Sequence, residues 1–113
     1  MDTIIKNISM NEVLNLKEQI SIREGEIVSK TLVQNEALSI TLFGIAKNEE
    51  ISTHQSTGDA FVYVLEGTGR FTVDGVAKEV KAGEALIMPH DVPHALFGQE
   101  AFKMLLTVVF PNE

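Results

Sequence analysis

The stretch HQSTGDAFVYVLEG, residues 54–67, decides the fold of this chain. Its centre, residues 61–65, is a run of aromatic and β-branched side chains, a composition that favours a β-strand. The run ends at Glu66 and Gly67, which predict a turn because glycine adopts positive φ angles at little cost. A strand bounded so closely by turn residues indicates a β-rich protein.

Short strands and turns alternate through most of the chain. Asp74-Gly75 is a dipeptide typical of hairpin turns, and Pro89 and Pro93 predict a loop because proline lacks the backbone N–H that a sheet requires. Short strands at this spacing indicate an all-β sandwich or barrel. The predicted strands are rich in β-branched and aromatic residues or alternate polar with apolar ones, and they cover residues 26–33, 38–45, 61–65, 70–73, 76–80, 85–88 and 104–110.

The N-terminal segment has a different pattern. Ser9 followed three residues later by Glu12 matches a capping box, which marks the start of a helix. We therefore predict a short helix over residues 10–18, with Val13 and Leu14 on an apolar face that packs against the barrel.

Composition limits the possible functions. A chain of 113 residues is long enough for one domain with a single core. A net charge of −7 argues against binding nucleic acid or an anionic membrane, both of which favour a basic face. There is no cysteine, which excludes thiol catalysis and disulfides. Residues 1–6 lack the pattern of a signal peptide and no apolar run is long enough to span a bilayer, so we expect a cytoplasmic protein.

Two motifs resemble the two signatures of the cupin family. The first family motif reads G, five residues, H-x-H, three or four residues, E, six residues, G, and residues 48–67 fit this frame without a gap. His54 and Gly67 match the first histidine and the final glycine. The substituted positions are Asn48 for the opening glycine, Ser56 for the second histidine and Ala60 for the glutamate.

The second family motif reads G, five residues, P-x-G, two residues, H, three residues, N, and it resembles residues 83–98. Gly83, Pro89 and the ligand histidine His94 are kept. Asp91 replaces the inner glycine and Gly98 replaces the final asparagine.

The resemblance implies a small single-domain cupin over residues 1–113. Its fold would be a double-stranded β-helix, or jelly-roll barrel, over residues 26–110. The N-terminal helix and arm would occupy residues 1–25.

Strand alternation predicts which side chains line the barrel. Side chains two residues apart share a face of a strand, so in the family frame Ala60 and Val62 point inward with His54 and Ser56. Phe61, Tyr63 and Leu65 then point outward and need cover, which either the N-terminal segment or a second subunit would supply. Because small cupins usually dimerise through such a face, we predict a homodimer.

The resemblance places His54 and His94 together inside the barrel as candidate metal ligands. Imidazole is a good ligand for zinc, iron, nickel and copper, although enzyme sites usually have three protein ligands. The candidate cofactor is a divalent ion of zinc, iron, nickel, manganese or copper. The predicted ligand pocket is lined by His54, Ser56, Ala60, Val62 and His94. The remaining histidine, His90, and the nearby Asp59 are predicted to be a solvated loop residue and a solvated or turn-capping residue.

Three hypotheses about function follow. In the first, the barrel binds a small molecule, with or without a weakly held metal. In the second, the protein is a dioxygenase- or isomerase-like enzyme, in which His54 and His94 hold a metal or one of them acts as a general base. In the third, the protein serves only as a partner for another protein. A third nitrogen or carboxylate beside the two histidines would favour the enzyme.

Overall fold

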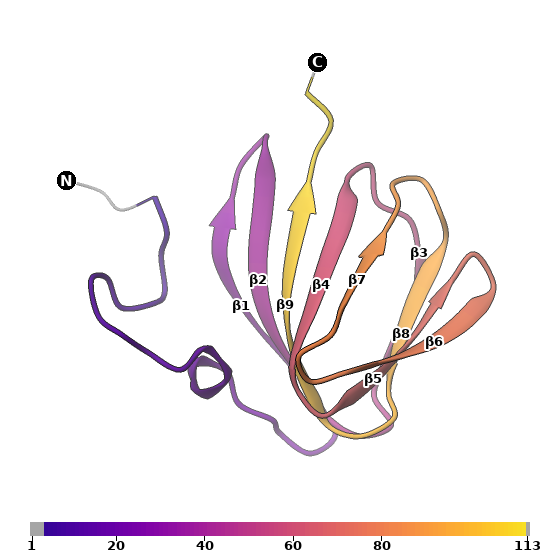
Figure 1. Cartoon of the computed structure of the whole chain (residues 1–113), viewed down its shortest axis with the longest axis horizontal. Helices are drawn as coiled ribbons and strands as arrows, with labels where there is room; N and C mark the ends of the chain where they lie inside the picture. Colours follow the sequence, from indigo (N-terminus) through magenta and orange to yellow (C-terminus); the bar gives the residue numbers. More distant parts are fainter. Residues whose placement is uncertain (1–3, 113) are drawn as a thin grey trace.

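The computed structural model describes residues 4–112, so Met1–Thr3 and Glu113, the ends of the predicted domain, lie outside the described residues. This part of the chain folds into nine strands that follow one short 3-10 helix, η1 (Figure 1). The elements are η1 Leu16–Gln19, β1 Ile27–Gln34, β2 Leu38–Ile45, β3 Glu50–His54, β4 Asp59–Glu66, β5 Thr68–Val73, β6 Val76–Lys81, β7 Ala85–Met88, β8 His94–Gly98 and β9 Phe102–Val109.

The strands form two antiparallel sheets. The larger sheet has the order β1-β2-β9-β4-β7, and the smaller sheet has the order β3-β8-β5-β6. The two sheets splay apart toward the end of the molecule that carries the β3–β4 and β7–β8 loops (Figure 1). The predicted all-β jelly-roll barrel is confirmed.

The core lies between the inner faces of the two sheets. Alternate residues of β4 point into it, and Ala60, Val62 and Val64 are all buried. From the two sides of the barrel, the rings of Phe71 and Phe102 meet edge to face, with centroids 5.9 Å apart. The predicted inward parity of β4 is therefore correct, and on its other face Phe61 and Tyr63 are exposed.

The predicted helix over residues 10–18 is wrong. Asn11 has a φ of 57°, a left-handed conformation that an α-helix does not accommodate. Val13, expected on the apolar face, is 105% exposed, so no tertiary contact stabilises a helix there. Only η1 forms, and no helix in residues 4–112 is long and apolar enough to cross a membrane.

Strand β8 was not predicted from sequence, although it holds the central candidate residue. It begins at His94, directly after the Pro89–Pro93 loop, and pairs with β3 on one side and β5 on the other. The seven strands whose ranges were predicted agree with the structure to within about two residues at each end. His94 is thus fixed by a ladder on both sides instead of by a loop.

Candidate metal and ligand site

His54 and His94 form a cross-strand pair at one mouth of the barrel. They are direct partners in the β3–β8 ladder, and their Nε2 atoms lie 3.1 Å apart. The rings meet edge to face with centroids 4.2 Å apart. His94 is only 4% exposed, whereas His54, on the edge strand, is open to solvent. The pair therefore has one buried and one accessible member.

A β-bulge turns His54 toward the barrel. Ile51 pairs with Leu96 and His54 pairs with His94, so two residues of β3, Ser52 and Thr53, oppose the single residue Ala95. In a regular strand, Thr53 would share the inner face with Ile51 and His54 would point outward. The extra residue shifts the parity by one and brings His54 to the inner face.

Backbone carbonyls fix the tautomer of each ring. His54 Nδ1 lies 2.9 Å from Ser52 O, and His94 Nδ1 lies 3.2 Å from Val92 O. A carbonyl oxygen only accepts hydrogen bonds, so each Nδ1 carries a proton and donates it. In the neutral rings, both Nε2 lone pairs then face each other at 3.1 Å. This arrangement favours an electrophile between the rings, either a shared proton or a metal ion.

His94 keeps its lone pair over a wider pH range than an ordinary histidine. Burial lowers the pKa of His94 below 6.5, and the nearby charge of protonated His54 lowers it further. The hydrogen bond to Val92 O acts in the opposite direction but is the smallest of the three effects. His94 is therefore a neutral, ligand-competent imidazole at pH 7.

The other three predicted pocket residues are placed differently from the histidines. Ser56 lies in the loop after β3, where its Oγ accepts a hydrogen bond from Gly58 N at 3.1 Å. Ala60 and Val62 are members of the main hydrophobic core. Their role as pocket walls stays a prediction, whereas Ser56 has a visible structural role in the turn.

Two substituted glycine positions retain a glycine-like backbone. Asn48, at the opening glycine of the first motif, has a φ of 72°, and Asp91, at the inner glycine of the second, has a φ of 58°. Asn and Asp tolerate the left-handed region better than other side chains. The frames assigned from sequence thus agree with the backbone conformation, even where the glycine is absent.

Asp59 and His90 form a second polar pair at the rim. Asp59 Oδ1 accepts hydrogen bonds from both the backbone N and the ring Nδ1 of His90, each at 2.8 Å. This contact raises the pKa of His90 and lowers the pKa of Asp59. Both side chains are largely exposed, which agrees with the predicted solvated loop position of His90 and with the solvated or capping role of Asp59. The ion pair between them was missed, since nothing local links residues 31 positions apart.

The number of available donor atoms limits how a metal ion can be held. Within residues 4–112 no group of three or more His, Cys, Asp or Glu side chains is placed to hold a metal. Two nitrogens 3.1 Å apart are nonetheless within reach of one ion, since bonds of about 2.0–2.1 Å at an angle of roughly 100° span that distance. The chain offers a two-nitrogen site whose remaining positions require water or a ligand.

These features define a barrel with a reduced metal motif, and the chain belongs to the cupin domain family, whose model matches residues 41–110. A curated relative, the dimethylsulfoniopropionate lyase DddW of Ruegeria pomeroyi, is 35% identical over 77 residues. The match covers 62% of this chain and 49% of the lyase, so the chain spans about half the length of that relative.

Two solved structures are similar over nearly the whole chain. A conserved protein of unknown function from Streptococcus pyogenes is 41% identical, with a TM-score of 0.96 over 99% of this chain and 98% of that one. A cupin superfamily protein from Desulfitobacterium hafniense is 29% identical, with a TM-score of 0.90 over 95% of this chain and 98% of that one.

Proposed function

We propose that this protein binds a small organic molecule at the barrel mouth through a divalent metal ion held weakly by His54 and His94. The observation that carries the proposal is the convergence of the two Nε2 lone pairs, each aimed by an Nδ1–H···O=C bond. A metal bound by only two protein nitrogens keeps several coordination positions free. An oxygen-donor ligand such as a carboxylate or carbonyl compound would fill them.

The residues of the chain orient the site, and the metal supplies Lewis acidity. The carbonyls of Ser52 and Val92 hold the rings in the metal-binding tautomer, as outer-shell partners of metal-bound histidines commonly do. The depressed pKa of His94 reduces proton competition at that ring. With two protein ligands in place of three, we expect modest affinity.

Calorimetric titration with Ni²⁺ and Zn²⁺ tests the proposal. We expect about one ion per chain, with affinity reduced at least about tenfold in His54→Ala and His94→Ala variants. The third histidine provides a matched control, because His90 is exposed and belongs to a different pair. A His90→Ala variant should bind the metal as the wild type does. Unchanged affinity in the His54 and His94 variants would contradict the proposal.

A lyase or another metal-dependent enzyme is the second candidate. It is favoured by the 35% identity to a named lyase over 62% of this chain. Incubation of the metal-loaded protein with dimethylsulfoniopropionate, followed by proton NMR, tests it. Consumption that His94→Ala abolishes would support an enzyme. An unchanged spectrum would exclude this substrate and leave the dioxygenase- and isomerase-like alternatives.

We further propose that the protein is a homodimer. Phe61 and Tyr63 of β4 expose large aromatic surfaces on the outer face of the larger sheet. Exposed apolar side chains grouped in this way are typical of an association surface. Light scattering coupled to gel filtration gives the mass directly, and a value of 12.4 kDa, that of one chain, would rule out the dimer.

A further inference from the structure

The outer face of the larger sheet has one covered half and one open half. On the covered half, Leu42 and Leu65 pack with Ile20 of the N-terminal segment in a second hydrophobic cluster. On the open half, Phe61 pairs with Ile87 across β4 and β7, and both side chains are exposed. The apolar surface therefore extends further across the sheet than the chain's own N-terminal segment reaches.

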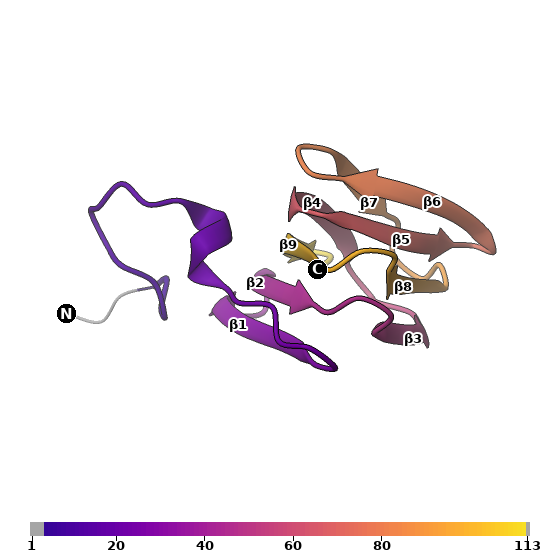
Figure 2. The same cartoon turned by 90° about the horizontal axis from the view of Figure 1, so that it is seen from below.

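The N-terminal segment has the converse property. Residues 4–15, here called the arm, curve away from both sheets in two perpendicular views (Figures 1 and 2). Met10 and Val13 lie on this curve, and Val13 is fully exposed. Ile4 and Ile5, at the start of the arm, are exposed as well. The arm thus carries apolar side chains that are partly or fully exposed to solvent, although Ile8 packs against the second hydrophobic cluster.

Both ends of the curve are attached to the barrel, while its middle is not. At one end, Lys6 N donates to Leu32 O at 2.9 Å and Asn7 Nδ2 donates to Thr31 O at 2.8 Å. At the other end the chain runs along the outer face of β2, so closely that a Cβ at Gly44 would overlap the carbonyl oxygen of Ser21.

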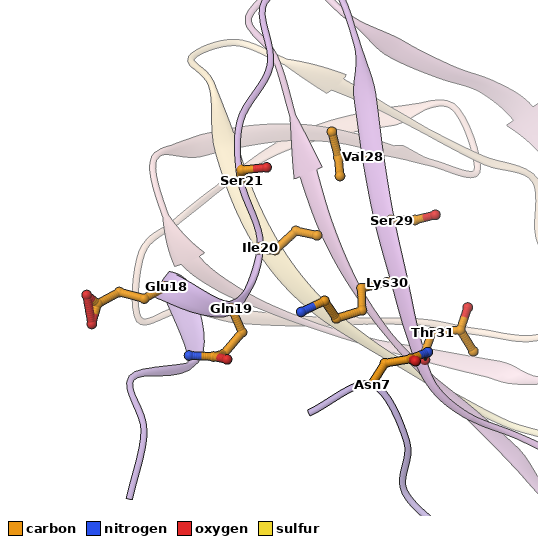
Figure 3. A pocket seen from close by; sticks show the side chains of 9 residues that line it. All are labelled: Asn7, Glu18, Gln19, Ile20, Ser21, Val28, Ser29, Lys30 and Thr31. Carbon is orange, nitrogen blue, oxygen red and sulfur yellow. Dashed lines mark hydrogen bonds between the residues drawn. The ribbon is translucent and has the colours of Figure 1, made fainter. Parts of the chain in front are cut away.

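A shallow surface groove of about 620 Å³ lies between these attachment points. Asn7 and Ile20 contribute from the N-terminal segment and Val28 and Lys30 from β1 (Figure 3). The arm is therefore attached to its own β1 near Lys6, Asn7 and Ile8, while Met10 and Val13 remain exposed.

The exposed apolar area is sufficient for a dimer. The exposed fractions of the apolar residues on the arm and the open face together equal the exposed surface of nearly five fully exposed residues. At roughly 150–200 Å² for a large apolar side chain, this amounts to about 700–950 Å² per chain. A standard interface buries about 800 Å² on each partner. The residues concerned are Ile4, Ile5, Met10, Val13, Phe61, Tyr63, Ile87 and Val109.

We infer that the arm of each subunit docks on the open half of the partner's larger sheet, a step that rests on the proposed homodimer. Each chain has exposed apolar surface both on the arm and on the open half of the larger sheet. A second copy related by a twofold axis would therefore bury both surfaces in one interface. The partner's arm would extend the hydrophobic cluster that Ile20 begins on the same face. The expected contacts join Met10 and Val13 to the partner's Phe61 and the partner's Ile87.

Chemical crosslinking between introduced cysteines tests the contact. The chain has no cysteine of its own, so only the introduced thiols react. Val13→Cys and Phe61→Cys chains, with tags of different mass, are co-expressed and treated with a bifunctional maleimide. Because each chain has one cysteine, any product that contains both tags joins two subunits. Met10→Cys with Ile87→Cys serves as a second pair. The control replaces Phe61→Cys by Val76→Cys, since Val76 is as exposed as Ile87 (56% each) but lies on β6 of the smaller sheet.

We expect the arm–sheet pairs to crosslink at least about tenfold faster than the Val13→Cys and Val76→Cys pair. A monomer mass in light scattering would overturn both the homodimer and the arm contact. A dimer mass with no preference for Phe61→Cys or Ile87→Cys over Val76→Cys would leave the homodimer standing and overturn the arm contact alone.

Discussion

At the scale of single residues, the chemistry of the site depends on which ring nitrogen carries the proton. Ser52 O and Val92 O each lie two residues before the histidine they orient. They leave both Nε2 atoms of the pair without a proton when the rings are neutral. Serine and alanine at the other two family ligand positions remove donors, but the two remaining donors are still aimed at one point.

Asp91 shows how a substituted glycine position is tolerated. Its φ of 58° is a region in which glycine has no steric cost and alanine costs roughly 1–2 kcal/mol. We predict that Asp91→Gly matches or exceeds the wild type in free energy of unfolding, and that Asp91→Ala is about 1 kcal/mol less stable than Asp91→Gly. Both variants lack the carboxylate, so their difference in urea unfolding isolates the backbone effect. Equal stability of the two would contradict this reading.

The Asp59–His90 pair predicts a specific pH dependence. Its hydrogen bond and charge raise the pKa of His90, so the histidine's contribution to stability is complete below pH 6.5 and is lost as pH rises through the raised value. Because the pKa of Asp59 is lowered, its contribution is lost only as pH falls through that lowered value. In an Asp59→Asn variant the amide oxygen still accepts both hydrogen bonds but carries no charge. The His90 midpoint measured by proton NMR should then move down toward 6.5, and a midpoint that does not move would mean the charge is unimportant.

At the scale of strands, the bulge in β3 decides which residue faces the barrel. A double variant that exchanges neighbours, Thr53→His with His54→Thr, tests this directly. In a regular strand Thr53 would be the inward position and the exchange would preserve metal binding. With the bulge, we expect the exchange to weaken metal binding as much as His54→Ala does, while the unfolding free energy stays close to that of the wild type. Thr53→Ala alone, which leaves His54 in place, is the control, and retained affinity in the double variant would argue for a regular strand.

The N-terminal segment shows the limit of local helix signals. Ser9 and Glu12 have the correct spacing for a capping box, yet the backbone at Asn11 is left-handed and η1 begins only at Leu16. Helices this short rely on packing of an apolar face. Because Val13 has no surface of its own chain to pack against, the signal from the cap is insufficient.

At the scale of the whole molecule, the histidine pair links an edge strand to the sheet. Strand β3 is the outermost strand of the smaller sheet and is held there by β8. A ligand that binds only the folded protein stabilises it by about 2.7 kcal/mol at a hundredfold excess over its dissociation constant. We therefore expect Ni²⁺ to raise the thermal midpoint by several degrees, with reversal by EDTA. The shift should disappear in His54→Ala and persist in His90→Ala, and a shift that survives in His54→Ala would place the ion elsewhere.

The sequence by itself determined the barrel, most of its strands and the alignment of its motifs. Strand and turn propensities, the Asp74-Gly75 hairpin and the inward parity of Ala60 and Val62 depend on interactions among neighbouring residues, so they are readable locally. The two motif frames are consistent with the positive φ angles at Asn48 and Asp91.

The tertiary structure alone decided how the site is aimed. The family resemblance predicted the inward direction of His54, but the bulge that produces it is defined only by pairing with β8. The lowered pKa of His94 comes from burial, and the Asp59–His90 pair joins the start of β4 to the loop before β8. The open half of the larger sheet likewise appears only once the path of the arm is known. Each of these features depends on contacts between residues distant in sequence. For that reason the fold could be predicted from the sequence, whereas the detailed geometry and protonation of the histidine site could not.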